Sequence, residues 1–233
     1  MTTKPLLASA IALLLASQAA LAATPSGFTA TYNVSQGDQP MGQATVTLRS
    51  AGNGEWIYSK DVKGTGGLAA LLGASAKESS RFRWKGDVPE AISYDYQMVA
   101  MGKNKQRRLS ADWSKNVVTV DEGKGAHTYA ATPGMVERNT AALALGVALR
   151  DGKQQVTLPV GGRQSIETQQ FKVTGKETVK VAAGTFNAER IDRSDKAQDF
   201  SAWYAPAKYP VPVKLSQHDG GDLTMELVSF QAQ

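Results

Sequence analysis

The segment TVKVAAGTFNAERI at residues 178–191, followed by FSAWYAPAKYPVPVKL at residues 200–215, decides the fold that the sequence predicts. Apolar and polar residues alternate along both parts, which is typical of strands with one buried face. Gly184 and Pro206 interrupt the alternation and indicate turns. The segment therefore predicts antiparallel strands joined by short connections.

Pro210 and Pro212 stand two residues apart in the last of these strands. Both lack a backbone N–H, and in a strand these missing donors lie along the same side. Val211 and Val213 would donate on the other side. We therefore expect this strand, or its start, to be an edge of the sheet.

The same two-residue period continues through the rest of the chain. In the first such run, Phe28, Ala30, Tyr32 and Val34 share one face. Asn53-Gly54 is a hairpin signal, because both residues tolerate a positive φ. Further strands are expected at residues 44–49, 55–58, 80–84, 92–98, 109–113, 116–120, 154–159, 166–173 and 223–227. The fold class is mainly β, with one antiparallel curved sheet forming an open or nearly closed β-barrel.

Residues 139–151 have helical rather than strand periodicity. Asn139 or Thr140 can cap the start, and Asp151-Gly152 stops the helix. A helix that is apolar nearly all round must be buried, so we expect it to pack against or plug the curved sheet. Gly146 costs up to ~1 kcal/mol of helix propensity, which indicates close packing there. A short helical turn is also expected at residues 67–73.

The first residues have the pattern of a secretory signal peptide. Lys4 precedes an apolar stretch at residues 6–16, and Ala20-Leu21-Ala22 matches the small-x-small cleavage pattern. The stretch is too short to span a bilayer comfortably, so no stable membrane span is expected. We predict a cleaved signal peptide over residues 1–22, a single domain over residues 23–233 and a periplasmic location.

The composition excludes several classes of chemistry. The chain has no cysteine, which excludes disulfides, thiolate nucleophiles and cysteine-based metal sites. About 210 residues remain after cleavage, enough to fold without disulfides. Removing Lys4 lowers the net charge from +5 to about +4, which suits an anionic envelope. No stacking motif accompanies this charge, so nucleic acid is not an expected partner.

No catalytic motif stands out. His127 and His218 lie near turn residues, and the adjacent His218 and Asp219 would point to opposite faces of a strand. Glu177, Glu189 and Asp192 stand beside Lys or Arg, which predicts cross-strand ion pairs. Phosphate-binding loops, dinucleotide fingerprints and Gly-x-Ser-x-Gly are absent. We expect no catalytic residue, no metal ligand and no cofactor.

The order of motifs along the chain resembles an exported bacterial family called domain of unknown function 3108. The specific matches are the turn at residues 181–186 and the hairpin from Trp203-Tyr204-Ala205-Pro206 to Pro212-Val213. The family's helix start often reads Asp-x-Leu-Ser, whereas residues 139–142 read Asn-Thr-Ala-Ala. The remaining matches are Phe28-x-Ala30-x-Tyr32-x-Val34, Gly42-Gln43-Ala44, Trp56-x-Tyr58, Pro89, Asp112-Trp113 and Asn139-Thr140. The resemblance implies an outline similar to periplasmic lipoprotein carriers, with a hydrophobic-ligand cavity and no implied reaction.

Two sets of residues are candidates for binding. Large apolar residues either fill the core or line a pocket for an acyl-like group. The dense basic run at residues 103–108 is either a solvated hairpin tip or a contact for an anion such as lipid phosphate. The candidate ligand-lining residues are Trp56, Trp84, Tyr96, Met98, Leu143 and Trp203, and the candidate anion contacts are Lys103, Lys105, Arg107 and Arg108.

The sequence leads to two functional hypotheses. The first is a non-enzymatic periplasmic protein of the cell envelope that binds a hydrophobic or lipid-like small molecule in its barrel. The alternative is an envelope scaffold with a solid core, which binds a protein or peptidoglycan through its edge strand and basic loop. A hydrolase with an unrecognised site ranks behind both.

Overall fold

The computed structural model describes residues 25–233 except 68–69, 71–72, 101, 197–199 and 219–221. The predicted signal peptide over residues 1–22 lies outside the described residues. Within them, no helix has both the length and the apolar character needed to cross a membrane.

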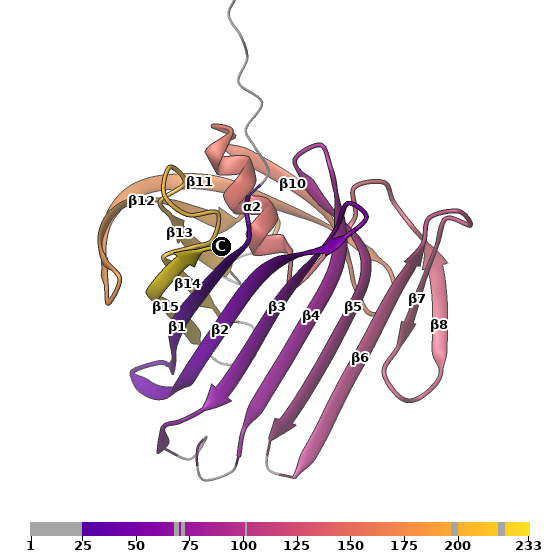
Figure 1. Ribbon diagram of the computed structural model, residues 1–233, viewed down its shortest axis with the longest axis horizontal. Helices are drawn as coiled ribbons and strands as arrows, with labels where there is room; N and C mark the ends of the chain where they lie inside the picture. The colour runs from indigo at the N-terminus through magenta and orange to yellow at the C-terminus, as the bar shows by residue number, and fades with distance from the viewer. Residues whose placement is uncertain (1–24, 68–69, 71–72, 101, 197–199, 219–221) are drawn as a thin grey trace, which may run out of the picture.

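The described chain forms one large curved sheet of 15 strands with a helix inside its curve (Figure 1). The strand order is β8-β7-β6-β5-β4-β3-β2-β1-β15-β14-β13-β12-β11-β10-β9. Neighbours are antiparallel, except that β9 and β10 run parallel. The elements are β1 (Phe28–Gln36), β2 (Gln39–Gly52), β3 (Glu55–Gly64), β4 (Ser75–Lys85), β5 (Val88–Ala100), β6 (Lys103–Asp112), β7 (Val117–Asp121), β8 (Ala126–Ala130), β9 (Val136–Glu137), α2 (Ala141–Arg150), β10 (Gln155–Gly161), β11 (Ile166–Val181), β12 (Gly184–Arg193), β13 (Phe200–Tyr204), β14 (Lys214–Gln217) and β15 (Leu223–Ala232).

The two-residue period predicts the buried face correctly. Phe28, Ala30, Tyr32 and Val34 on β1 are all buried, and the residues between them are partly or fully exposed. The Asn53-Gly54 hairpin is confirmed, with φ angles of 51° and 75°. First and last strands pair with each other, from Phe28 opposite Ala232 to Gln36 opposite Leu223. The first and last strands are therefore neighbours in the sheet, and the antiparallel order continues across them.

The two ends of the sheet, β5 to β8 on one side and β9 with β10 on the other, approach each other without forming a strand ladder. Ala91 N–H on β5 donates to the Met135 carbonyl oxygen just before β9, at 2.8 Å. Tyr129 Oη on β8 donates to the Gly162 carbonyl oxygen after β10, at 2.9 Å. Buried side chains fill the space between them. The barrel is thus nearly closed, but by scattered contacts and not by a strand ladder.

Helix α2 confirms the predicted buried helix. Residues 143–149 are all buried, and the Tyr204 hydroxyl donates to the Ala142 carbonyl oxygen at 2.8 Å. Thr140 occupies the N-cap position as predicted, but its side chain makes no capping bond. The carboxylate of Glu137 accepts the backbone N–H groups of Asn139 and Thr140 instead. A buried acid three residues upstream therefore accepts the N–H of the N-cap residue and of the residue before it, and fixes the backbone that leads into the helix.

The prediction that the strand of Pro210 and Pro212 forms an edge is wrong. Residues 210–213 are not strand, and β14 begins at Lys214 between β13 and β15. Val213 bonds on both sides, donating to the Trp203 carbonyl oxygen at 2.8 Å and accepting from Leu227 N–H at 2.9 Å. The Pro212 carbonyl oxygen accepts from the Tyr32 hydroxyl. The prolines thus lie in a largely buried connection between β13 and β14, not in a strand at the edge of the sheet.

Two smaller predictions need adjustment. The strands expected at residues 166–173 and 178–181 are one strand, β11, with a register shift between Val173 and Gly175. The helical turn predicted at residues 67–73 is described only in part. Ala70 N–H donates to the Gly66 carbonyl oxygen at 3.2 Å, and residues 68–69 and 71–72 lie outside the described residues.

Candidate functional site

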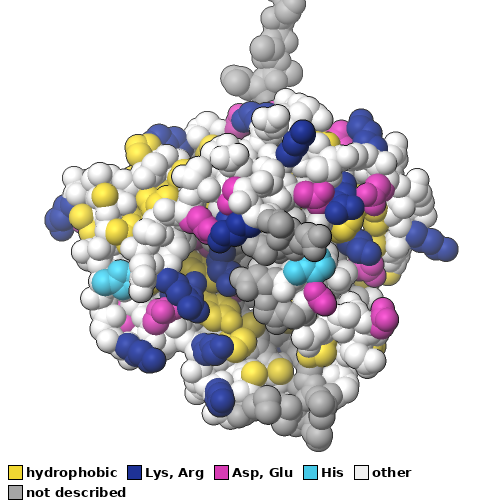
Figure 2. All heavy atoms as spheres, turned by 180° about the vertical axis from the view of Figure 1, so that it is seen from behind, with side chains coloured by type: hydrophobic (Ala, Val, Ile, Leu, Met, Phe, Trp, Pro, Cys, Tyr) yellow, Lys and Arg dark blue, Asp and Glu magenta, His cyan; other side chains and the backbone are white. Residues whose placement is uncertain are grey.

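A cavity of about 480 Å³ lies between the curved sheet and the start of α2. Residues from β1 to β5 form one wall, and residues from β11 to β15 form the other. Its apolar lining includes Val34, Val46, Phe171, Leu215 and Met225. From behind, the molecule shows a hollowed face on which hydrophobic side chains lie beside several Lys and Arg side chains (Figure 2). The interior is therefore not solid.

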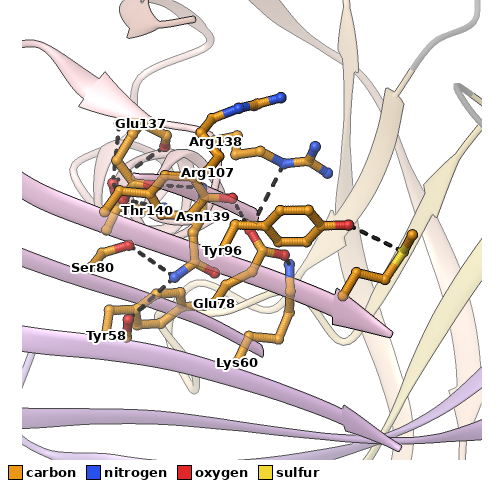
Figure 3. Close-up of polar contacts among 12 residues, drawn as sticks. Tyr58, Lys60, Glu78, Ser80, Tyr96, Arg107, Glu137, Arg138, Asn139 and Thr140 are labelled. Atoms are coloured by element: carbon orange, nitrogen blue, oxygen red, sulfur yellow. Dashed lines mark hydrogen bonds and ion pairs between the residues drawn. The ribbon is translucent and has the colours of Figure 1, made fainter. Parts of the chain in front are cut away.

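One polar cluster in the cavity wall is centred on Glu78 of β4. Its carboxylate lies 2.7 Å from Lys60 Nζ and 3.8 Å from Arg138 Nε, and accepts from the Tyr94 hydroxyl at 2.7 Å. Burial acts to raise the pKa of Glu78, but the charges and hydrogen bonds of these neighbours lower it overall. Glu78 is thus held ionised as the partner of two cations (Figure 3).

Next to this cluster, a network of hydrogen bonds fixes the residues that precede α2 in the core. Glu137 accepts from Asn139 N–H at 2.7 Å and from the Thr140 hydroxyl at 2.7 Å. The Asn139 amide nitrogen donates to the Tyr58 carbonyl oxygen and to Ser80 Oγ (Figure 3). Burial raises the pKa of Glu137 above its ordinary value, despite the hydrogen bonds that it accepts. This network positions the start of the helix at the cavity.

A second polar cluster lies in the opposite wall, centred on Glu167 of β11. Its carboxylate lies 2.6 Å from Lys196 Nζ and 3.0 Å from an Arg193 terminal nitrogen, and it accepts from Gln169. The bond from Lys196, followed by that from Gln169, lowers the pKa of Glu167 to about 2. Arg193 also pairs with Asp195 at 2.9 Å. The cavity therefore has an apolar interior and charged groups on both walls.

Of the six predicted ligand-lining residues, Tyr96 lines this cavity. Trp56, Trp84, Leu143 and Trp203 belong instead to the packed core or its border. Met98 is half-buried and accepts a hydrogen bond from the Tyr96 hydroxyl at 3.2 Å. Aromatic rings do line the cavity, but apart from Tyr96 they are not the expected ones: they belong to Tyr32, Tyr58, Phe171 and Phe200.

The predicted anion-contact residues lie on β6, and none of them is among the residues that line the cavity. The run begins at the hairpin turn and continues along the strand, so it is not confined to the tip. Arg107 pairs with Glu122 at 2.8 Å, and Arg108 pairs with Asp95 at 3.4 Å. Lys103 and Lys105 are exposed. The four residues therefore share one strand. Arg107 comes nearest to the cavity, because it pairs in register with the lining residue Tyr96 (Figure 3).

Two of the predicted cross-strand ion pairs are confirmed: Arg190 lies 3.4 Å from Glu177 and Lys176 lies 3.2 Å from Glu189, across β11 and β12. Asp192 pairs with Arg190 at 2.9 Å within β12, so that pair is not cross-strand.

Neither histidine lines the cavity between the sheet and α2. His218 Nδ1 lies 2.7 Å from Asp222 on an exposed surface, and His127 is exposed on β8. Among the described residues, no group of three or more His, Cys, Asp or Glu side chains could hold a metal ion.

Sequence reasoning missed the charged residues of the cavity, and Arg138 above all. Arg138 is the one exposed residue in the stretch 135–140, and its neighbours on both sides are buried. A single cation within the run Met-Val-Glu-Arg-Asn-Thr, just before a buried helix, is a signal that could have identified it. Glu78 and Glu167 carry a signal of the same kind, because alternation places Glu78 on the face of Phe82 in β4 and Glu167 on the face of Phe171 in β11, where an acid is unexpected.

Comparisons with known proteins agree with this fold. The profile of the family described as "Protein of unknown function (DUF3108)" matches residues 31–228, which confirms the resemblance seen in the motifs. No curated protein sequence matches the chain. A crystal structure from Brucella abortus, described as a beta-barrel-like protein of domain of unknown function DUF1849, is similar with a TM-score of 0.50 and 9% identity. The match covers 90% of this chain and 99% of that one, and at this identity it shows the fold alone.

Proposed function

We propose that this chain, which belongs to the DUF3108 family of proteins of unknown function, binds a lipid-like ligand in the cell envelope. In this proposal it is a periplasmic, non-enzymatic protein that holds the apolar part of the ligand inside its curved sheet. The cavity of about 480 Å³ carries the proposal, because its volume falls in the range of roughly 300–1,000 Å³ usual for small-molecule sites.

The charged groups of the cavity support binding over catalysis. Glu78 and Glu167 both accept from neighbouring cations, and the pKa of each lies below its ordinary value. A general acid or base works best with a pKa near the operating pH. Two carboxylates held ionised in this way are suited to fix cations in the wall.

The alternative, an envelope scaffold with a solid core, has less support. The segment predicted to be its edge strand, residues 210–213, is not a strand, and the cavity argues against a solid core. The features that still support the scaffold hypothesis are the exposed edge strand β8 and the exposed Lys103 and Lys105.

The proposal is tested by purifying the protein from native periplasm and analysing extracted small molecules by mass spectrometry. We expect a co-purified amphiphile in near-stoichiometric amount. Protein that is free of any such molecule, and that also fails to bind an added apolar dye, would count against ligand binding.

Two variants, each with one alanine replaced by tryptophan, locate the binding site. Ala76 on β4 is half-buried and lines the cavity, so Ala76→Trp should reduce dye binding at least tenfold by filling it. Ala111 on β6 is also half-buried but is not among the lining residues. Ala111→Trp is therefore the matched control and should bind the dye as the unmodified protein does.

A further inference from the structure

The cavity wall contains one cation whose hydrogen-bonding groups are largely unused. Arg138 touches Glu78 only through Nε, at 3.8 Å, and its side chain is 50% exposed. Among the described residues, its two terminal nitrogens make no hydrogen bond. A guanidinium carries five N–H donors arranged to bind carboxylate or phosphate oxygens in pairs. Arg138 thus keeps most of its donors available.

The other cations of the cavity are more fully paired. Lys60 lies 2.7 Å from Glu78, and Lys196 lies 2.6 Å from Glu167. Arg193 lies between Glu167 and Asp195. In that second cluster two acids balance two cations, whereas in the first Glu78 alone contacts both Lys60 and Arg138. The ion pairs of the first cluster therefore leave one positive charge unbalanced, and Arg138 belongs to that cluster.

The backbone on both sides of Arg138 is fixed. Glu137 is buried and accepts from Asn139 N–H and Thr140 N–H, and the Asn139 amide is bonded to Tyr58 and Ser80. Anchored neighbours reduce the entropy lost when Arg138 orders around an anion. The same residues begin α2, so the position of Arg138 is set by the packing of the helix.

We propose that Arg138 binds the anionic head group of a single-chain amphiphile whose chain lies along the apolar lining of the cavity. This rests on the proposed ligand-binding function and adds the class of ligand. The shared chemistry is an anionic oxygen, from either a carboxylate or a phosphate ester. Arg138 lines the same cavity as the apolar residues Val62, Ala76 and Leu145, so the chain of an amphiphile whose head group is bound there can lie along them.

The test measures displacement of an apolar dye from the purified mature protein by dodecanoate, dodecyl phosphate and the neutral dodecanol. We expect the better of the two anions to bind at least tenfold more tightly than dodecanol. Arg138→Gln should remove at least fivefold of that preference and leave the affinity for dodecanol within twofold. Arg138→Lys should retain part of the preference, because the charge remains while the paired donors are lost.

Arg81→Gln is the matched control. Arg81 lies on β4, is 46% exposed and pairs with Glu55 outside the cavity, so its loss should leave all three affinities unchanged. Tighter binding of dodecyl phosphate than of dodecanoate would identify a phosphate head group, and the reverse would identify a carboxylate.

Two results would overturn the inference, and they differ. If Arg138→Gln keeps the same preference for anions over dodecanol, Arg138 is not the head-group residue, although ligand binding stands. If none of the three compounds displaces the dye from the unmodified protein, the proposed function fails and the head-group assignment fails with it.

Discussion

Gly146 of helix α2 lies so close to the carbonyl oxygen of Pro210 that a Cβ atom added to the glycine would be 2.0 Å from that oxygen. A backbone oxygen in a packed connection cannot move aside cheaply. Alanine gains up to ~1 kcal/mol of helix propensity over glycine, but overpacking costs about 1–3 kcal/mol and occasionally more. We therefore expect Gly146→Ala to lower the free energy of unfolding by roughly 2 kcal/mol or more, measured by urea denaturation.

Gly175 on β11 is the control for this substitution. A Cβ there would meet nothing within 4 Å, and its φ is not in the left-handed region. Gly175→Ala should leave stability unchanged within about 1 kcal/mol. If Gly146→Ala is as stable as Gly175→Ala, the helix does not press on the Pro210 segment.

Glu137 should be the most sensitive acid in the domain. Its carboxylate accepts from Asn139 N–H, Thr140 N–H and the Thr140 hydroxyl, all buried. Each buried donor left without a partner costs about 1–3 kcal/mol, so Glu137→Ala should destabilise the fold by roughly 3–5 kcal/mol. Thermal unfolding measures this.

Glu226→Ala gives the comparison for an exposed acid. Glu226 is 43% exposed and pairs with Lys214 at 3.2 Å, and such surface pairs contribute up to about 1 kcal/mol. Equal melting temperatures for the two variants would show that the Glu137 network does not stabilise the start of α2.

Trp203 is a core residue despite its polar indole nitrogen. It is 9% exposed, and its Nε1 donates to Glu177 at 2.9 Å. Truncation to alanine should cost ~3–5 kcal/mol, as for other large core side chains. In a domain of this size that corresponds to a melting temperature lowered by roughly 6–20 °C. A change of only one or two degrees would mean that the ring contributes little to the core.

Strand periodicity predicted the architecture because the inward-facing residues of each strand are buried and therefore apolar, while the residues between them face outward. Each β1 residue that alternation placed inward is buried, and the helix that was apolar nearly all round is enclosed. The Pro210 prediction was wrong for a related reason. A missing N–H indicates only that no partner strand accepts from it, and a buried connection against a helix satisfies that as well as an edge does.

The candidate site was predicted less well, because a cavity depends on where side chains fail to meet. Trp56 and Trp203 were expected to line it, yet both pack in or against the core. The aromatic residues that do line it are Tyr32, Tyr58, Tyr96, Phe171 and Phe200. Arg138 and Glu167 come from opposite walls that are far apart in sequence. Only the curvature of the sheet brings such residues to one cavity, and local alternation does not encode it.

Asp195 should make part of the stability depend on acid pH. Its bonds from Arg193, and a backbone bond from Gln170, lower the pKa of Asp195 from 3.8 to about 2, against a smaller opposing effect of burial. Because the folded pKa lies below the unfolded value, the ionised form favours the folded state. This contribution is fully present above about pH 4 and is lost as the pH falls toward 2. At a partly exposed site we expect it to be about 1 kcal/mol after solvent screening.

Asp195→Asn should therefore destabilise the protein by this amount at pH 7 and by much less at pH 2.5, measured by urea denaturation at both values. Asp38→Asn, which changes an exposed carboxylate in the β1–β2 turn, is the control and should alter neither value. A destabilisation by Asp195→Asn that is the same at both pH values would show that the Arg193 pair does not depend on the charge of Asp195.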